Sequence, residues 1–363
     1  ENGCTNNNSL RCKILSDNTL TSDSSIDFTK ISSPTNGQGL YRDDKYGDSE
    51  NYYFRGGSFC AYTDYLSEND TGAKCTAAGG TWTDYKCNLD LSKTTCESKG
   101  FTWYELKNNV KFGDYYWKII RIDDNGDVRL LYNGNSTNAR GTDAQIGTAP
   151  FSGENGDNTY VGYMHASTLD TISKKQAASN EINSDIKTYN ENWYTNTSNL
   201  STLASMISSN VGYCNDRMTT QTKDGGIGSK ETIYDTAYRV SEQPSYKCTN
   251  ESNDLFTLSS NIYGNKKLSA PVGLITVDEL AYAGSLFSNY NFQVYTHSGY
   301  WYWTISPAFC SSGVAASFIL KQTGDFSYNN SYSDSGARPV VSLNSAALVS
   351  TGSGTLADPY IIE

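Results

Sequence analysis

The last quarter of the chain carries a dense aromatic run, then a polar stretch rich in Asn, Ser and Tyr, and then a strand-like segment. There, runs of aromatic and β-branched residues are separated by polar stretches rich in Ser, Asn and Gly. Residues of the first kind favour strands, and the polar stretches favour the turns between them. The pattern therefore predicts strands at residues 300–306, 314–320, 338–343 and 359–362.

Two further apolar segments predict a β-hairpin. Residues 110–122 and 128–132 are strand-like, and Asp123–Asp127 between them contains an Asn-Gly pair, a strong hairpin signal. This acidic turn has a faint likeness to a calcium-binding loop. That loop needs an acid where Arg121 stands and a Glu that does not follow at the required distance. A plain hairpin turn is the favoured interpretation.

Helical spacing is confined to the middle of the chain. Apolar residues recur every three or four positions at 184–194 and 200–207. Thr276–Glu279 has the form of a capping box and predicts a helix at Val277–Ala283, directly after a buried strand at 271–275. Together these patterns predict an α+β fold with mainly antiparallel strands, a few helices and long loops.

Composition shifts divide the chain. We expect residues 1–37 to be a polar N-terminal lead-in and residues 38–363 to form one domain, interrupted by a cysteine-rich insert at 57–106. Inside the insert, Cys75–Trp82 resembles Cys96–Trp103, since in both a Cys is followed by Gly and then Thr-Trp. So small a unit cannot bury a core of its own, so disulfides would have to hold it together.

Nine cysteines indicate an oxidising compartment. Zinc would favour C-x-x-C pairs, which the chain lacks, and only two histidines could serve as further ligands. Disulfides are the better interpretation, and we expect an extracellular location and no metal. Proximity in the sequence suggests the pairs Cys4–Cys12, Cys75–Cys87, Cys60–Cys96 and Cys214–Cys248. Cys310 would remain free.

Charge and composition exclude some partners. The formal charge of −11 argues against nucleic acid, whose phosphates need clustered Lys and Arg. No stretch approaches the roughly 18 apolar residues of a membrane span. With 28 Tyr and 31 Gly, the chain is rich in residues that suit half-buried surfaces and turns.

Motifs for catalysis are weak. His165 and His297 lie outside any recognisable hydrolase motif, and the Gly-rich Asp224–Lys230 lacks the spacing of a phosphate-binding loop. Carboxylates are common, but no pair stands out as a glycosidase pair. Sugar binding is more plausible than sugar hydrolysis, because Trp and Tyr faces stack on sugar rings. We therefore expect a protein that binds rather than an enzyme, with no cofactor.

Several segments together resemble a group of bacterial cell-surface proteins. They are Gly39–Tyr41, Tyr52–Gly56, Val110–Ile122, Cys214–Arg217, Gly273–Glu279, Tyr302–Pro307, Gly336–Val341 and Gly352–Tyr360. That group is a branch of the C-type-lectin-like fold, in the subtype shared with formylglycine-generating enzymes. The catalytic cysteine context of those enzymes is not apparent here, so the resemblance does not imply their activity. The resemblance spans residues 38–363, apart from the insert.

In similar proteins the segment between the Trp-Thr-x-Ser-Pro and Arg-Pro-Val strands faces the ligand. In some it is diversified by retroelements, and the Asn-, Ser- and Tyr-rich Ala308–Ser335 agrees with such diversification. Cys310 could then be one outcome at a randomised position, which we favour slightly, or a small buried residue. The resemblance implies a ligand-binding set that comprises Tyr300, Tyr302, Phe309, Cys310, Ser312, Phe318, Lys321, Asp325, Tyr328, Asn330 and Tyr332.

The leading hypothesis is a non-enzymatic, surface-displayed adhesin-like protein. Its ligand would be a protein or glycan on another cell, a phage or a host surface. One alternative is a pilin-like or filament subunit with a partner in the filament or cell envelope. A further alternative is an enzyme of the formylglycine-generating type, which would need a reactive pair of cysteines.

Overall fold

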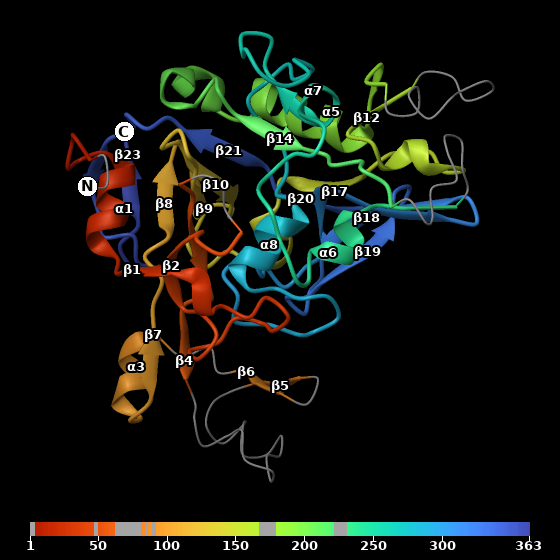
Figure 1. Ribbon diagram of the computed structural model, residues 1–363. Coiled ribbons are helices and arrows are strands. Elements are labelled where there is room, and N and C mark those ends of the chain that lie inside the picture. Colours follow the sequence, from red (N-terminus) through yellow and green to blue (C-terminus); the bar gives the residue numbers. More distant parts are fainter. Residues whose placement is uncertain are drawn as a thin grey trace.

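The computed structural model describes residues 4–46, 50–61, 81–83, 86–88, 92–166, 179–220 and 231–363. Over these residues the chain is a mixed α+β protein built mostly from strands, with few helices (Figure 1). Most strand pairs are antiparallel, as expected. None of the described helices has the length and apolar character needed to cross a membrane.

The first sheet has nine strands and brings the two ends of the chain together (Figure 1). Its strands are β1 (Leu20–Ser22), β2 (Gly39–Arg42), β3 (Tyr52–Arg55), β8 (Asn109–Phe112), β9 (Tyr115–Ile122), β10 (Val128–Tyr132), β21 (Val340–Leu343), β22 (Val349–Thr351) and β23 (Tyr360–Ile362). The helix α1 (Leu10–Asp17) buries Leu10 and Ile14 in the core of this sheet. The segment expected as a polar lead-in is thus part of the first sheet and its core.

The hairpin predicted from the Asn-Gly turn is confirmed, with β9 and β10 paired antiparallel from Ile122↔Val128 onward. The predicted long strand 110–122 is two strands, because Gly113 turns the chain at φ +60 between β8 and β9. In the acidic turn, the Asp123 carboxylate accepts hydrogen bonds from the backbone N–H groups of Asn125 and Asp127, both at 3.0 Å. That carboxylate therefore stabilises the turn itself.

The second sheet has six strands, in the order β11-β20-β17-β18-β19, with β15 paired to β17. They are β11 (Gly147–Pro150), β15 (Glu231–Ile233), β17 (Tyr302–Ser311), β18 (Val314–Leu320), β19 (Phe326–Asn330) and β20 (Asp334–Ala337). The predicted strand 314–320 is found with the same bounds. Residues 308–335, expected as a ligand-facing segment, form the end of β17, all of β18 and β19, and the start of β20.

Small two-stranded sheets complete the strand content. They are β4 (Phe59–Ala61) with β7 (Thr102–Tyr104), β5 (Thr81–Thr83) with β6 (Lys86–Asn88), β12 (Met164–His165) with β13 (Ile182–Asn183), and β14 (Gly212–Cys214) with β16 (Leu255–Thr257). The described helices besides α1 are α3 (Lys93–Ser98), α5 (Asp185–Asn192), α6 (Thr236–Arg239), α7 (Glu251–Asp254) and α8 (Val277–Ala283), with 3-10 turns that include Leu200–Met206.

The capping box before α8 is confirmed, with both reciprocal bonds between Thr276 and Glu279 at 3.0 Å. The strand predicted just before it, at 271–275, is wrong. Only Gly273 makes a ladder contact there, a bridge to Val340. A Cβ on Gly273 would lie 2.3 Å from the Tyr213 ring, so this segment is buried by close packing rather than by strand pairing.

Three of the expected disulfides are formed, namely Cys4–Cys12, Cys60–Cys96 and Cys214–Cys248. The fourth, Cys75–Cys87, includes Cys75, which lies outside the described residues. Cys60–Cys96 joins β4 to α3, so a cross-link does hold the described part of the insert together.

Lys118 on β9 is a cation buried in the first sheet. Its Nζ donates to Asn109 Oδ1 (2.5 Å) and to the Thr137 carbonyl (2.9 Å). Burial, with smaller contributions from the nearby cations Arg338 and Arg140, lowers the pKa of Lys118 to about 7. Because an unfolded Lys has its ordinary pKa near 10.5, the unfolded chain binds the extra proton between these two values.

Stability should therefore rise with pH above about 7. We expect the unfolding free energy of the wild type, minus that of Lys118→Met, to increase between pH 7 and 9.5, at up to ~1.4 kcal/mol per pH unit. Urea titrations at each pH provide the measurement. The exposed Lys111→Met is the matched control and should show no trend. A flat difference for Lys118→Met would contradict this assignment.

Candidate functional site

Aromatic rings form a row on one face of the second sheet. Phe318 and Tyr328 are direct partners across β18 and β19, and Phe309 on β17 is paired with Ala316 two residues along. Because side chains two residues apart share a face, these rings lie on the same side. Tyr328, at 45% exposure, meets the Phe309 ring edge-on at 4.6 Å between centroids.

A loop adds a second exposed ring to this row. Phe287 bridges to Phe326, and its ring stacks against Tyr328 with centroids 6.2 Å apart and planes at 21°. We call Phe309, Tyr328 and Phe287 the aromatic row. Tyr328 is its centre, in contact with a ring on either side.

The loop that carries Phe287 is held firmly. Asn291 Nδ2 donates to Ser32 Oγ (3.0 Å) and to the Gly284 carbonyl (2.9 Å). A Cβ on Gly324 would lie 1.9 Å from the Asn291 carbonyl oxygen, so the loop packs directly on the chain before β19. The row is therefore presented by a fixed backbone rather than by a loose loop.

Beside the row lies an open hollow of about 320 Å³, lined by Ser288, Asn289, Tyr290 and Lys321. The Lys321 ammonium stands 5.7 Å from the centre of the Tyr290 ring and 3.4 Å from the Asp325 carboxylate. Asp325 is fully buried, so its role is to position Lys321.

The sheet ends in a tip made by two turns. We define the tip as the β17–β18 hairpin, Ser311–Val314, together with Asn330–Tyr332, which begin at the last residue of β19. Ser312 has a left-handed backbone (φ +51), and its N–H donates to Glu231 at 2.8 Å. Tyr332 is 48% exposed, and its hydroxyl lies 3.3 Å from Asn330 Nδ2.

The structure divides the predicted ligand-binding set into two groups. The exposed or half-buried members are Tyr300, Phe309, Ser312, Lys321, Tyr328, Asn330 and Tyr332. Of these, Tyr300 precedes β17 at the end remote from the tip, whereas Phe309, Ser312, Tyr328, Asn330 and Tyr332 lie on the row or the tip. Phe309 and Tyr328 contact each other, and Tyr328 contacts Phe287, whereas Ser312, Asn330 and Tyr332 lie at the tip.

The other four members are buried, so direct ligand contact does not fit their positions. Tyr302 and Asp325 are 0% exposed, Cys310 is 1% and Phe318 is 2%. Nearly every residue of β17 and β18 is buried, and Phe318 is covered although it shares a face with Tyr328. They belong to the framework under the surface.

Phe287 and Tyr290 were not predicted from the sequence. The signal was present, because Leu286–Phe292 combines three aromatic rings with Ser and Asn, much as residues 326–332 do. Nothing in the order of residues shows, however, that these two segments meet in space.

Cys310 is the one free cysteine among the described residues. Burial raises the pKa of its thiol to about 12. The position supports the interpretation of a small buried residue rather than an exposed randomised one.

We expect the Cys310 thiol to be inert in the folded protein. With a pKa of about 12, only ~10⁻⁴ of it is thiolate at pH 8. Thiol titration at pH 8 should give the same count for the wild type and Cys310→Ala when folded. After denaturation the wild type should show one thiol more. Fast reaction of Cys310 in the folded protein would contradict the structure.

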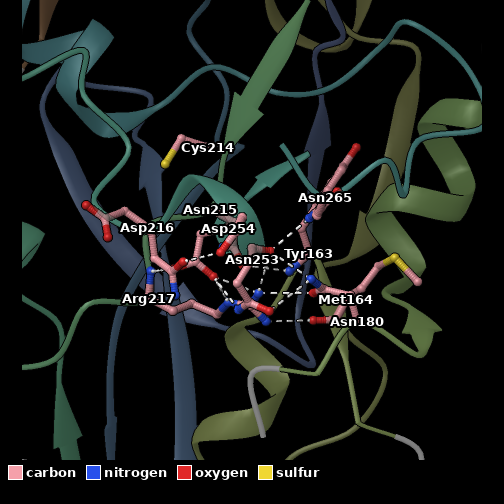
Figure 2. A network of polar contacts seen from close by, with 12 residues as sticks. Tyr163, Met164, Asn180, Cys214, Asn215, Asp216, Arg217, Asn253, Asp254 and Asn265 are labelled. Carbon is pink, nitrogen blue, oxygen red and sulfur yellow. Dashed lines mark hydrogen bonds and ion pairs between the residues drawn. The ribbon is translucent and has the colours of Figure 1, made fainter. Parts of the chain in front are cut away.

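A buried polar network fixes β17 from behind (Figure 2). Asn215 Nδ2 donates to the Ile305 carbonyl of β17 at 2.7 Å, and Asn215 Oδ1 accepts from the Tyr163 N–H at 2.9 Å. Arg217 pairs with Asp254 at 2.8 Å. Figure 2 shows these side chains converging, with Arg217 also directed toward Met164 and Asn180. The network is covalently tied to residue 248 through Cys214.

The histidines make structural contacts. His165 Nδ1 lies 3.0 Å from the Ala166 carbonyl oxygen. His297 is bracketed by the carbonyl oxygens of Phe292 (3.1 Å) and Gln322 (2.8 Å), and burial lowers its pKa. Over the part of the chain that the structure describes, no group of three or more His, Cys, Asp or Glu could hold a metal ion.

Comparison of the chain with protein-family models, with curated proteins and with solved structures finds no match in any of the three.

Proposed function

We propose that this protein is a non-enzymatic binding module displayed outside the bacterial cell, with a C-type-lectin-like fold of the formylglycine-generating-enzyme subtype. Its binding face consists of the aromatic row and the tip. The observation that carries the proposal is the position of Tyr328, exposed yet packed between two rings that are themselves accessible.

Such a surface is suited to recognition. Tyr and Phe supply a large contact area at low conformational-entropy cost, and aromatic residues dominate binding hot spots. Neighbouring rings further restrict Tyr328, so less side-chain freedom is lost when a ligand binds. Exposed aromatic clusters of this kind mark interaction sites on soluble proteins.

The segments that resemble the cell-surface group support the proposal by where they lie. Trp303 Nε1 donates to the Ala149 carbonyl at 2.8 Å, and Arg338 is fully buried between the sheets. The motifs on either side of residues 308–335 are therefore framework. Between them, Ser312, Tyr328 and Tyr332 are exposed and could be exchanged without disturbing the core, as diversification by a retroelement would require.

Three disulfides in the described chain support an extracellular location. Each closes a separate part of the molecule, at α1, in the insert and behind β17. A reducing compartment would lose all three.

Replacing Tyr328, Asn330 and Tyr332 together by Ala should abolish binding, because it removes the centre of the row and the exposed side chains of the tip. The unfolding free energy should fall by only about 1 kcal/mol, since Tyr328 and Tyr332 are about half exposed and Asn330 is half-buried at the end of a strand. Binding is measured against a glycan array and a phage-displayed random peptide library, and stability by thermal unfolding.

The matched control replaces Tyr238, Ile262 and Tyr263 by Ala, which are exposed at 55%, 80% and 66% and lie off the face. It should keep every interaction of the wild type. If both triple variants bind like the wild type, the proposed face is not a binding face. A large loss of stability in the first variant would place its residues in the core.

A further inference from the structure

The tip is ringed by three exposed carboxylates that come from different parts of the chain. Glu231 begins β15 beside the hairpin, where its carboxylate accepts the Ser312 N–H at 2.8 Å and Ser311 Oγ at 3.4 Å. Asp334 begins β20 only two residues after Tyr332.

The third carboxylate belongs to Glu154, and it is placed by its neighbour. Asn155 Oδ1 accepts a hydrogen bond from the Ala315 N–H at 2.9 Å, at the start of β18. The Ser152 N–H donates to the Ser331 carbonyl at 2.9 Å, beside Tyr332. Residues 152–155 therefore run along the tip, and Glu154 is exposed there.

Basic residues are scarce on these strands. Residues 302–337 contain one, Lys321, and it lies at the end of β18 away from the tip, paired with Asp325. Among the described residues placed at the tip, the exposed charged ones named above, Glu154, Glu231 and Asp334, are all acidic. The whole chain has the same sign, with a formal charge of −11.

We infer that the partner of the binding face is a protein surface that presents Lys or Arg side chains. This inference rests on the proposed function and adds the partner's chemistry to it. The faces of Tyr328 and Tyr332 attract cations through their ring quadrupoles. The exposed carboxylates of Glu154 and Asp334 can give charge-assisted hydrogen bonds to a guanidinium or ammonium, and the net charge speeds the encounter.

A glycan fits these observations less well. Neutral sugars would stack on the row but would gain little from three carboxylates, and acidic sugars would be repelled by them. A basic protein surface uses both the rings and the charges. Lys321 lies on the opposite side of the row. It would then face either an acidic group of the same partner or the solvent at the edge of the contact.

The test pans a phage-displayed random peptide library on the wild type and removes peptides that also bind the Tyr328, Asn330 and Tyr332 triple Ala variant. The remaining, face-dependent peptides should be enriched in Lys and Arg, and their affinity should fall as NaCl is raised. Individual peptides are then synthesised and their affinities measured by calorimetry.

A charge reversal tests the carboxylates around the tip directly. Glu154→Lys with Asp334→Lys should weaken the face-dependent peptides about tenfold or more, because attraction becomes repulsion. Glu242→Lys with Glu251→Lys changes the net charge by the same amount at exposed sites off the face and should have a much smaller effect. Thermal unfolding of both variants confirms that they fold.

The outcomes distinguish the inferred cationic partner from the proposed binding face. Face-dependent peptides that are neutral or acidic, or face-dependent glycans with no such peptides, overturn the cationic partner and leave the binding face standing. Equal effects of the two charge reversals also overturn it. If no peptide and no glycan depends on the face, the proposed function and this inference both fail.

Discussion

The arrangement of the two sheets depends on one buried guanidinium. Arg338 lies where the chain leaves β20 of the second sheet and enters β21 of the first, and it is fully buried. It donates to the carbonyl oxygens of Tyr132 (2.9 and 3.1 Å) and Thr296 (2.6 Å), and it stacks on the Tyr302 ring at 4.6 Å. Desolvating a cation is costly unless its donors are satisfied, so these partners must keep their positions together. The end of β10, the start of β17 and the loop before it are thereby fixed relative to one another.

Much of the fold could be read from local signals. The Asn-Gly hairpin, the capping box at Thr276 and the strand 314–320 each depend on residues close in sequence, and each is present. The segment 271–275 was misjudged because a fully buried apolar run looks the same whether it pairs as a strand or only packs. The ring of Tyr213, from a distant part of the chain, packs against Gly273 and determines that this segment packs rather than pairs. The packing of α1 against the first sheet was missed for a related reason. Its few apolar residues form a core only together with residues of β22 and β23, which lie more than 300 positions away in the sequence.

About half of the residues that form the proposed binding face could be predicted from the sequence. The resemblance to the cell-surface group indicated residues 308–335 as the ligand-facing segment, and it implied the exposed Tyr328 and Tyr332 and the half-buried Asn330. Strand alternation could not show that nearly every position of β17 and β18 is buried, so Tyr302, Cys310 and Phe318 were expected to contact the ligand although they are buried. Phe287 needs a contact between residues some forty positions apart, which no periodicity encodes. The carboxylates around the tip could not be predicted for the same reason, because Glu154 and Glu231 reach the tip only through the pairing and packing of the second sheet.

Figure 1 places the amino and carboxyl ends of the chain together at one edge of the first sheet, whereas β19 lies across the molecule. The N-terminal segment is hydrogen-bonded to the C-terminal one. The Leu10 N–H donates to the Ala347 carbonyl and the Val349 N–H to the Asn8 carbonyl, both at 2.8 Å. Any polypeptide joined to either end thus departs from the side opposite the aromatic row. A tether at either terminus would therefore hold the protein at the edge of the first sheet, with β19 across the molecule from the attachment.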